Sequence, residues 1–230
     1  MKISPHPQGS VEWSIARAGI PTASEFDQLF TSDMEPRKGA MPTTYLHKKL
    51  SEKWRGGPLA SLNTFDMEQG KVLEEQAVPW FEMETGLTVQ RVGLCTTDDG
   101  RVGASPDGLI DDIGGIEIKC PAIHTHVGYL LAGKIPNDYI PQVNGCLWVT
   151  GRVGWEFLSY SMELPKLRLR MISDSQTMSR IGQVLGEFLA RFDAAWAQLC
   201  DANGGEPKRN IAPSPMPKAQ FISDLNDIIP

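Results

Sequence analysis

The chain has few cysteines, no long apolar run and no excess of positive charge, and each of these absences excludes a class of protein. Its cysteines offer neither a CxxC zinc-binding spacing nor a dense disulfide framework; they are Cys95, Cys120, Cys146 and Cys200. No apolar stretch approaches the ~20 residues that cross a bilayer, and the first residues, MKISPHPQGSVEW, lack the apolar core of a signal peptide. We therefore expect reduced thiols and a cytoplasmic protein that does not enter a membrane.

The length and composition are those of one sizeable globular domain or of two small ones. Of the 230 residues, 41% are hydrophobic and 22% are charged, which is enough for a substantial core. The net charge of -6 argues against a protein that coats nucleic acid by charge alone, although an acidic outer surface can coexist with a local basic groove.

The composition changes abruptly after Gly204 and Gly205. The following stretch, EPKRNIAPSPMPKAQ, is too polar and too rich in proline to pack a core. We therefore expect a folded domain over residues 1–203 and a Pro-rich linker with an acidic-hydrophobic C-terminal tail over residues 204–230. The end of the tail, FISDLNDIIP, is typical of a docking peptide; the alternatives are a tail that folds onto its own subunit and a tail that is disordered.

Periodicity and turn residues predict a mixture of helices and strands. Two helices are expected within residues 10–30, the second capped by Thr22 or Ser24. Apolar residues at every third or fourth position predict further helices over 43–54, 64–86, 122–133 and 175–202. Strands are predicted over 88–96, 102–104, 109–111, 116–119, 153–161 and 167–173. Residues 142–149 form a largely apolar segment that fits a helix or a strand equally well.

The most informative stretch is residues 105–120, SPDGLIDDIGGIEIKC. Successive side chains of a strand point to opposite faces, so Glu117 and Lys119 share one face while Ile116 and Ile118 bury the other. A bend over residues 111–115 folds Asp107 back beside them. Two carboxylates and a lysine then lie together.

That combination suits the hydrolysis of a phosphodiester. Mg²⁺ prefers a few carboxylate oxygens and retained waters, and it lowers the pKa of a bound water. A lysine beside it can orient the water or stabilise developing negative charge. The alternative is that Asp107 is an ordinary turn residue and that Glu117 and Lys119 lie on a solvent-facing strand. The apolar opposite face and the proline before Asp107 favour the metal site.

Four stretches carry a resemblance to a known family. They are WSIARAGIPTASE (13–25), GKVLE (70–74), SPDGL with EIKCP (105–109 and 117–121), and QVNGCLWVT (142–150), which follows Pro141 where the family has alanine. Spread over roughly residues 10–200, they resemble the lambda-exonuclease-like, or YqaJ-like, viral recombinase nucleases of the PD-(D/E)xK superfamily. The resemblance implies a three-layer α/β/α nuclease fold with a central mixed β-sheet.

The resemblance also implies roles for the residues of the metal site. Asp107 and Glu117 would hold the metal ions together with the backbone carbonyl of Ile118, and Lys119 would contact the attacking water and the scissile phosphate. Glu74 would orient water at the edge of the site; the alternatives are an ion-pairing role for Glu74, or Glu75 in its place.

DNA contacts follow from the same resemblance. Arg17 and Ser24, with Thr22 in the same segment, match a pocket for a 5′-terminal phosphate, and the chemistry is apt because arginine binds phosphate with two hydrogen bonds. The alternative is that Ser24 only caps a helix and Arg17 is a surface cation. Met67 would wedge apart the terminal base pairs, or be an ordinary residue of its helix. Gln142 would contact substrate or support the site, or be a core amide. Arg37 or Lys38 would follow the DNA backbone.

The implied activity is Mg²⁺-dependent, processive 5′-to-3′ degradation of one strand of duplex DNA. It would start at 5′-phosphorylated ends, release mononucleotides and leave a 3′ overhang for phage recombination by strand annealing. The resemblance further implies two Mg²⁺ ions per site with Mn²⁺ as a substitute, a homotrimeric ring, and a phage single-strand annealing protein as partner in the bacterial cytoplasm. The alternatives are an endonuclease of restriction or repair type, and an inert module that binds DNA ends.

Overall fold

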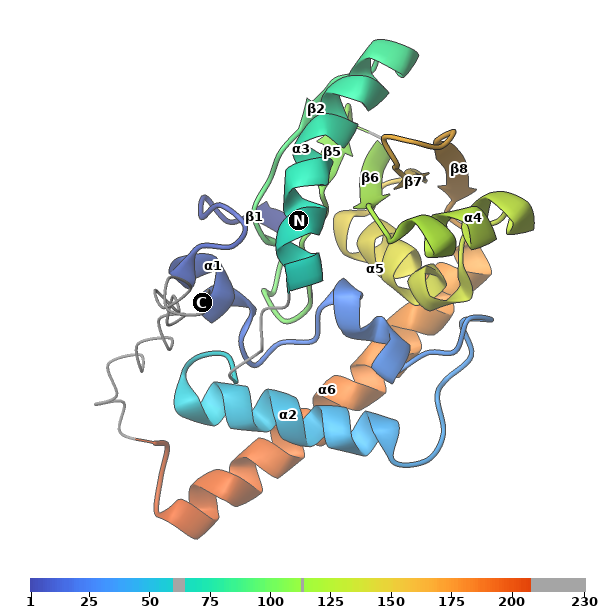
Figure 1. Cartoon of the computed structure of the whole chain (residues 1–230). Helices are drawn as coiled ribbons and strands as arrows, with labels where there is room; N and C mark the ends of the chain where they lie inside the picture. The colour runs from blue at the N-terminus through green and yellow to red at the C-terminus, as the bar shows by residue number, and fades with distance from the viewer. Residues whose placement is uncertain (60–64, 113, 208–230) are drawn as a thin grey trace, which may run out of the picture.

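The structure is a computed structural model that describes residues 1–59, 65–112 and 114–207, and of residues 65–72 it gives the course of the backbone (Figure 1). Its elements in chain order are β1 (Lys2–Ile3), α1 (Val11–Arg17), η1 (Ala23–Gln28), α2 (Met41–Arg55), α3 (Phe65–Thr85), β2 (Val89–Gln90), β3 (Cys95–Thr96), β4 (Gly103–Ala104), β5 (Gly108–Ile110), β6 (Gly114–Lys119), α4 (Ile123–Ala132), η2 (Asn137–Tyr139), α5 (Ile140–Thr150), β7 (Gly154–Ser159), β8 (Leu167–Ile172) and α6 (Ser175–Asn203).

The main sheet has five strands in the order β2-β5-β6-β7-β8. Only β6 and β7 run parallel, while the other neighbours are antiparallel, so the sheet is mixed as predicted. Parallel neighbours need a long crossover, and here α4, η2 and α5 supply it between β6 and β7. The predicted bend after Asp111 closes a hairpin in which Gly108 pairs with Ile116.

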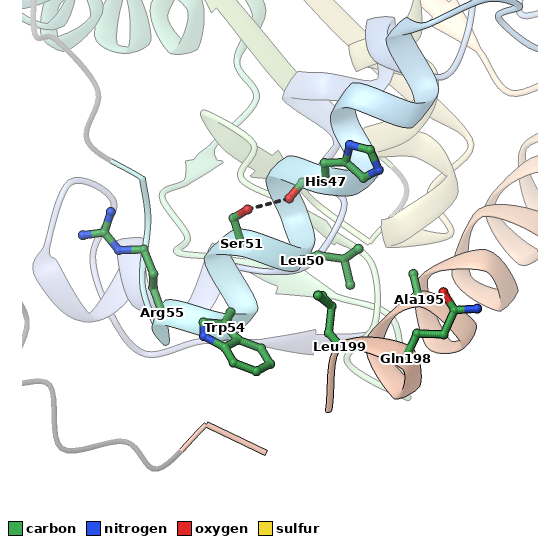
Figure 2. Close-up of a pocket in the computed structure, with 8 residues that line it drawn as sticks. All are labelled: His47, Leu50, Ser51, Trp54, Arg55, Ala195, Gln198 and Leu199. Atoms are coloured by element: carbon green, nitrogen blue, oxygen red, sulfur yellow. Dashed lines mark hydrogen bonds between the residues drawn. The ribbon is translucent and has the colours of Figure 1, made fainter. Parts of the chain in front are cut away.

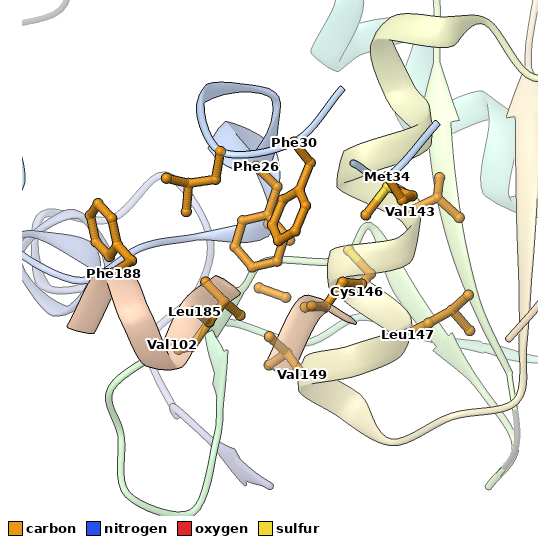
Figure 3. Close-up of a cluster of buried hydrophobic side chains, with 14 of the residues drawn as sticks. Phe26, Phe30, Met34, Val102, Val143, Cys146, Leu147, Val149, Leu185 and Phe188 are labelled. Carbon is orange, nitrogen blue, oxygen red and sulfur yellow. The ribbon is translucent and has the colours of Figure 1, made fainter. Parts of the chain in front are cut away.

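Helices cover both faces of this sheet, which gives the predicted three layers. On one face, Phe81 of α3 belongs to a buried cluster with Ile116 and Ile118 of β6. On the other, α5 packs with η1 and α6 around Trp155 and Phe157 in a larger core, part of which is drawn in Figure 3. Because β6 is buried on both sides, its polar residues lie inside the protein and not on an open strand.

Glycines allow the closest approaches within the sheet. A Cβ on Gly115 would lie 2.3 Å from the ring of Trp155, its register partner on β7. A Cβ on Gly108 would lie 2.2 Å from Val89 Cγ1. Gly115 thus leaves room on β6 for the fully buried indole of Trp155, and Gly108 lets β5 lie close to Val89 of β2.

Several predicted elements differ from the observed ones. The single strand predicted over 88–96 is wrong: it divides into β2 and β3, which belong to different sheets. Between them Gly93 passes so close to the N-terminal segment that a Cβ there would lie 2.3 Å from His6 O. The N-terminal strand β1, which the sequence did not reveal, completes a second sheet in the order β1-β3-β4.

The helical predictions hold with two refinements. The second helix expected within residues 10–30 is the short 3-10 helix η1, and residues 142–149, which fitted either element, are helical as part of α5. Helix α6 begins at the Asp174 cap, whose carboxylate accepts from Thr177 N, and ends at Gly204. The tail predicted over 204–230 lies outside the described residues from residue 208 onward. None of the helices in the described part of the chain combines the length and apolar character needed to cross a membrane.

Candidate active site

The carboxylates of Asp107 and Glu117 meet at the hairpin of β5 and β6. Asp107 directly precedes β5, and its Oδ2 accepts a hydrogen bond of 2.6 Å from the backbone N–H of Ile118. Glu117 lies in the middle of β6 with only 2% of its surface exposed. The β5–β6 hairpin, and not proximity in sequence, therefore brings the two acids together.

Lys119 and Gln142 complete this carboxylate cluster. Lys119 Nζ lies 2.5 Å from Glu117 Oε1 and 4.7 Å from the centre of the Tyr139 ring. The amide of Gln142, on α5, donates to Glu117 Oε1 at 2.6 Å and accepts from Lys119 Nζ at 3.5 Å. Both contacts fix the orientation of the amide, so Gln142 supports the two charged groups and is not an isolated core amide.

Negative charge is concentrated unfavourably in this cluster. Burial, and then the charges of Glu117 and Glu74, raise the pKa of Asp107 well above its usual value. Burial likewise raises the pKa of Glu117, although Lys119 opposes the shift. Burial alone would lower the pKa of Lys119, but the carboxylates outweigh it and raise that pKa. Further positive charge at the site would therefore stabilise the ionised carboxylates.

The donor set fits a hard divalent cation. Glu117 Oε2 is buried and has no hydrogen-bond partner among the described residues, and a carboxylate oxygen without a donor accepts a metal ion readily. Within the described ranges, no three His, Cys, Asp or Glu side chains are grouped closely enough to enclose an ion. Mg²⁺ does not need such a cage, because it binds one or two carboxylates and keeps several waters.

Glu74 lies at the edge of the cluster, on α3. Its carboxylate forms an ion pair with Arg91, whose guanidinium also lies 3.4 Å from the carbonyl oxygen of Asp107. Glu75, the alternative for this role, is exposed. Sequence reasoning missed Arg91, since nothing in its spacing indicates that it meets a helix residue seventeen positions earlier.

A second cluster gathers Arg17, Thr22 and Ser24. Arg17 Nη2 lies 2.9 Å from Ser24 Oγ and 3.5 Å from Thr22 Oγ1. The guanidinium stacks 4.3 Å above the ring of Trp13, and its Nε is buried without a partner in the described part of the chain. Burial lowers the pKa of Arg17, and Glu25 opposes this. A half-buried guanidinium whose Nε–H has no partner among the described residues is suited to an anion.

Trp13 connects the Arg17 cluster to the carboxylate cluster. Its indole Nε1 donates at 3.0 Å to Ser105 Oγ, two residues before Asp107. The same loop is held by Gln8, whose amide donates to Pro106 O at 2.7 Å. Trp13 and Ser105 belonged to the motifs of the sequence, but their contact across 92 residues gave no sequence signal.

Two of the residues predicted to contact DNA lie apart from both clusters or cannot be described. Arg37 Nε donates to Asp27 O at 2.5 Å, so in the structure this side chain braces its own loop. Met67 lies on α3, but its side chain is outside the described residues.

A groove of about 680 Å³ between α2 and α6 shares no residue with either cluster. Figure 2 shows its walls, with Trp54 and Leu50 of α2 facing Leu199 of α6. The lining is mainly apolar and offers no pair of carboxylates, so the groove contributes nothing to phosphodiester chemistry.

Comparison with known proteins places the chain among viral recombination proteins. Residues 12–153 match the YqaJ-like viral recombinase domain. Two crystal structures of the alkaline exonuclease LHK-Exo from Laribacter hongkongensis resemble it, one of them in complex with dAMP. The dAMP complex is 32% identical with a TM-score of 0.76, and the other is 31% identical with a TM-score of 0.77. Each comparison covers 85% of this chain and 98% of the LHK-Exo chain.

A more distant structure shares the fold. The phage related exonuclease from Haemophilus somnus 129PT is 14% identical with a TM-score of 0.59, over 78% of this chain and 96% of that chain. No curated protein sequence matches the chain significantly.

Proposed function

Because the chain belongs to the family of YqaJ-like viral recombinase domains, we propose that it degrades one strand of duplex DNA from 5′-phosphorylated ends. The chain is a deoxyribonuclease. In the proposed reaction it moves processively in the 5′-to-3′ direction, releases mononucleotides and leaves a 3′ overhang for strand annealing. The dAMP bound to LHK-Exo is a mononucleotide of this kind.

One observation carries the proposal: two buried atoms of complementary character lack partners in the described part of the chain. Glu117 Oε2 is an acceptor suited to a cation, and Arg17 Nε is a donor suited to an anion. The contact between Trp13 and Ser105 ties the two clusters together. A metal site beside an anion pocket is what a nuclease needs if it recognises a terminal phosphate while it cleaves a neighbouring bond.

The carboxylate cluster supplies the chemistry. Asp107, Glu117 and the carbonyl of Ile118 would hold two Mg²⁺ ions, with Mn²⁺ as a substitute. Bound metal supplies Lewis acidity and a water of lowered pKa. Lys119 orients the attacking water and stabilises negative charge on the phosphate. Gln142 holds the side chains of Lys119 and Glu117 in position, and Glu74 orients water at the edge of the site.

The Arg17 cluster supplies the end preference. Arg17 donates to the terminal phosphate while the hydroxyls of Thr22 and Ser24 add further hydrogen bonds. A hydroxyl end offers no charge to this pocket and binds weakly. Met67 separates the terminal base pairs, and Arg37 follows the DNA backbone.

We assign processivity to a ring-shaped assembly of subunits around the DNA and not to electrostatic attraction between the protein and the DNA. A homotrimeric ring that encloses the DNA retains it even though the net charge of the chain is -6. A phage single-strand annealing protein would take up the exposed 3′ strand in the cytoplasm of the bacterial host. The C-terminal tip, residues 221–230, at the end of the tail that follows the proposed domain of residues 1–203 and extends over 204–230, is the segment we assign to such a contact.

The test is digestion of linear duplex DNA with Mg²⁺, comparing 5′-phosphorylated and 5′-hydroxyl ends with closed and nicked circles. We expect loss of one strand from phosphorylated ends only, and no reaction with EDTA or with Lys119→Ala. Cutting of closed circles would instead identify an endonuclease. Binding of duplex ends without any release of nucleotides would identify an inert end-binding module.

A further inference from the structure

Arg91 connects helix α3 to the loop that carries Asp107. It directly follows β2, whose Gln90 pairs with Leu109 on β5, so it lies across the sheet edge from Asp107. Its guanidinium forms the ion pair with Glu74, lies 3.4 Å from the backbone carbonyl of Glu74, and lies 3.4 Å from the carbonyl of Asp107. One side chain thus holds together two segments of the carboxylate cluster.

The ion pair between Arg91 and Glu74 affects the net charge of the carboxylate cluster more than the stability of the fold. Glu74 brings a third negative charge to the cluster, and its charge contributes to the raised pKa values of Asp107 and Glu117. Arg91 forms an ion pair with Glu74, and Lys119 forms one with Glu117. The side chain of Arg91 is 48% exposed and that of Glu74 is 27% exposed, and ion pairs so open to water stabilise a fold little.

We propose that Arg91 is a positioning residue of the nuclease site, which holds the Glu74 carboxylate at the edge of the metal site and offsets its charge. This inference rests on the proposed function of the carboxylate cluster. Arg91 acts through Glu74 and does not touch the reacting atoms. It should therefore affect metal binding and turnover in opposite directions.

Metal binding to the DNA-free protein measures the charge effect without any catalysis. Removing a positive charge near a divalent ion should tighten its binding, so Arg91→Ala should bind Mn²⁺ more tightly, on the order of tenfold by calorimetry. Arg91→Lys keeps the charge and should bind Mn²⁺ within about twofold of the wild type. Glu117→Gln should abolish the measured binding, which assigns the signal to this cluster.

Turnover measures the positioning effect. Lysine cannot reproduce the planar fork that contacts Glu74 and the Asp107 carbonyl together, so kcat should fall in Arg91→Lys as well as in Arg91→Ala, by about tenfold or more. If Arg91 acts through Glu74, adding Arg91→Ala to Glu74→Ala should cause no further loss beyond about threefold. The matched control is Arg101→Ala, which removes an arginine paired at 2.6 Å with Asp193 and 39% exposed; its affinity and kcat should stay unchanged.

The results separate this inference from the function on which it rests. A wild type without Mg²⁺-dependent nuclease activity would refute the proposed function, while the Mn²⁺ affinities would still test the charge effect. Unchanged Mn²⁺ affinity in Arg91→Ala, or kcat losses that multiply with those of Glu74→Ala, would overturn the positioning role. A loss confined to KM for DNA, with a weaker dependence on salt, would overturn it as well, since Arg91 would then be a phosphate contact.

Discussion

Replacing Arg17 by alanine should remove the preference for 5′-phosphorylated ends while leaving the chemistry intact. The guanidinium lies 2.9 Å from Ser24 Oγ and stacks on Trp13, so it is fixed in place before any phosphate arrives. Hydrogen bonds to a charged group contribute about 1.5–3 kcal/mol each to binding. Loss of the guanidinium should therefore lower kcat/KM on phosphorylated ends by on the order of 100-fold, and change it little on hydroxyl ends.

The assay is single-strand loss from duplexes that differ only in the terminal phosphate, with kcat/KM measured for both. Arg17→Lys keeps the charge but loses the planar guanidinium and its stacking on Trp13, so we expect it to retain an intermediate preference of about tenfold for phosphorylated ends. Ser24→Ala removes one hydroxyl donor and should cost roughly three- to tenfold. Arg180→Ala is the control, since that arginine pairs with Glu35 at 2.7 Å and belongs to neither cluster.

Two results would refute this reasoning. Equal losses on phosphorylated and hydroxyl ends would make Arg17 a general DNA contact and not an end reader. A preference that survives in Arg17→Ala, with the fold intact by circular dichroism, would place the phosphate pocket elsewhere.

Three further predictions concern stability and the link between the clusters. Burial alone would raise the pKa of Glu25, but its lysine partners lower it to about 2, from a usual value of 4.5. The ionised Glu25 carboxylate therefore adds up to about 3 kcal/mol to the free energy of unfolding above pH ~4.5, and this contribution is lost as the pH falls toward 2. In urea unfolding, Glu25→Gln should be less stable than the wild type at pH 6, and the difference should vanish near pH 2. Gly115→Ala would place a Cβ 2.3 Å from an indole ring, and urea unfolding should show a loss of about 2 kcal/mol or more; unchanged stability would contradict the observed packing. Trp13→Phe keeps an aromatic face beneath Arg17 but loses one hydrogen bond, so kcat should fall by up to about tenfold while the end preference persists; a lost preference would mean that the indole itself shapes the pocket.

The hairpin of the site was predictable because its information is local. The alternation over residues 114–119 assigns faces by strand geometry, and turn residues after Asp111 bring Asp107 back. The buried Ile116 and Ile118, and the contact between Lys119 and Glu117, agree with that prediction. Their roles in metal binding and catalysis stay predictions.

The parts of the fold and of the site that the sequence did not predict depend on contacts between distant segments. Arg91 meets Glu74 only because β2 leads the chain back past α3, and Trp13 meets Ser105 across 92 residues. The helix α5 was ambiguous because it is buried between layers: a Cβ on Gly145 would lie 2.6 Å from the Phe26 ring. A helix apolar on every side loses the periodicity by which helices are recognised in sequence.

The placement of Glu117 on β6, opposite an Asp107 that precedes β5, makes enzymatic activity a direct measure of strand register. A slip of one residue between β6 and its neighbours would turn Ile116 and Ile118 toward the metal site and bury Glu117 against α3. The turn that follows Asp111 should therefore not accept changes of length that shift the pairing of Gly108 with Ile116, and Asp111, in a left-handed conformation with φ of 46°, restricts the residue types at its own position. Natural variation and loop engineering at this hairpin should be confined to changes that preserve that pairing, and recovered activity after refolding should count only molecules with correct register.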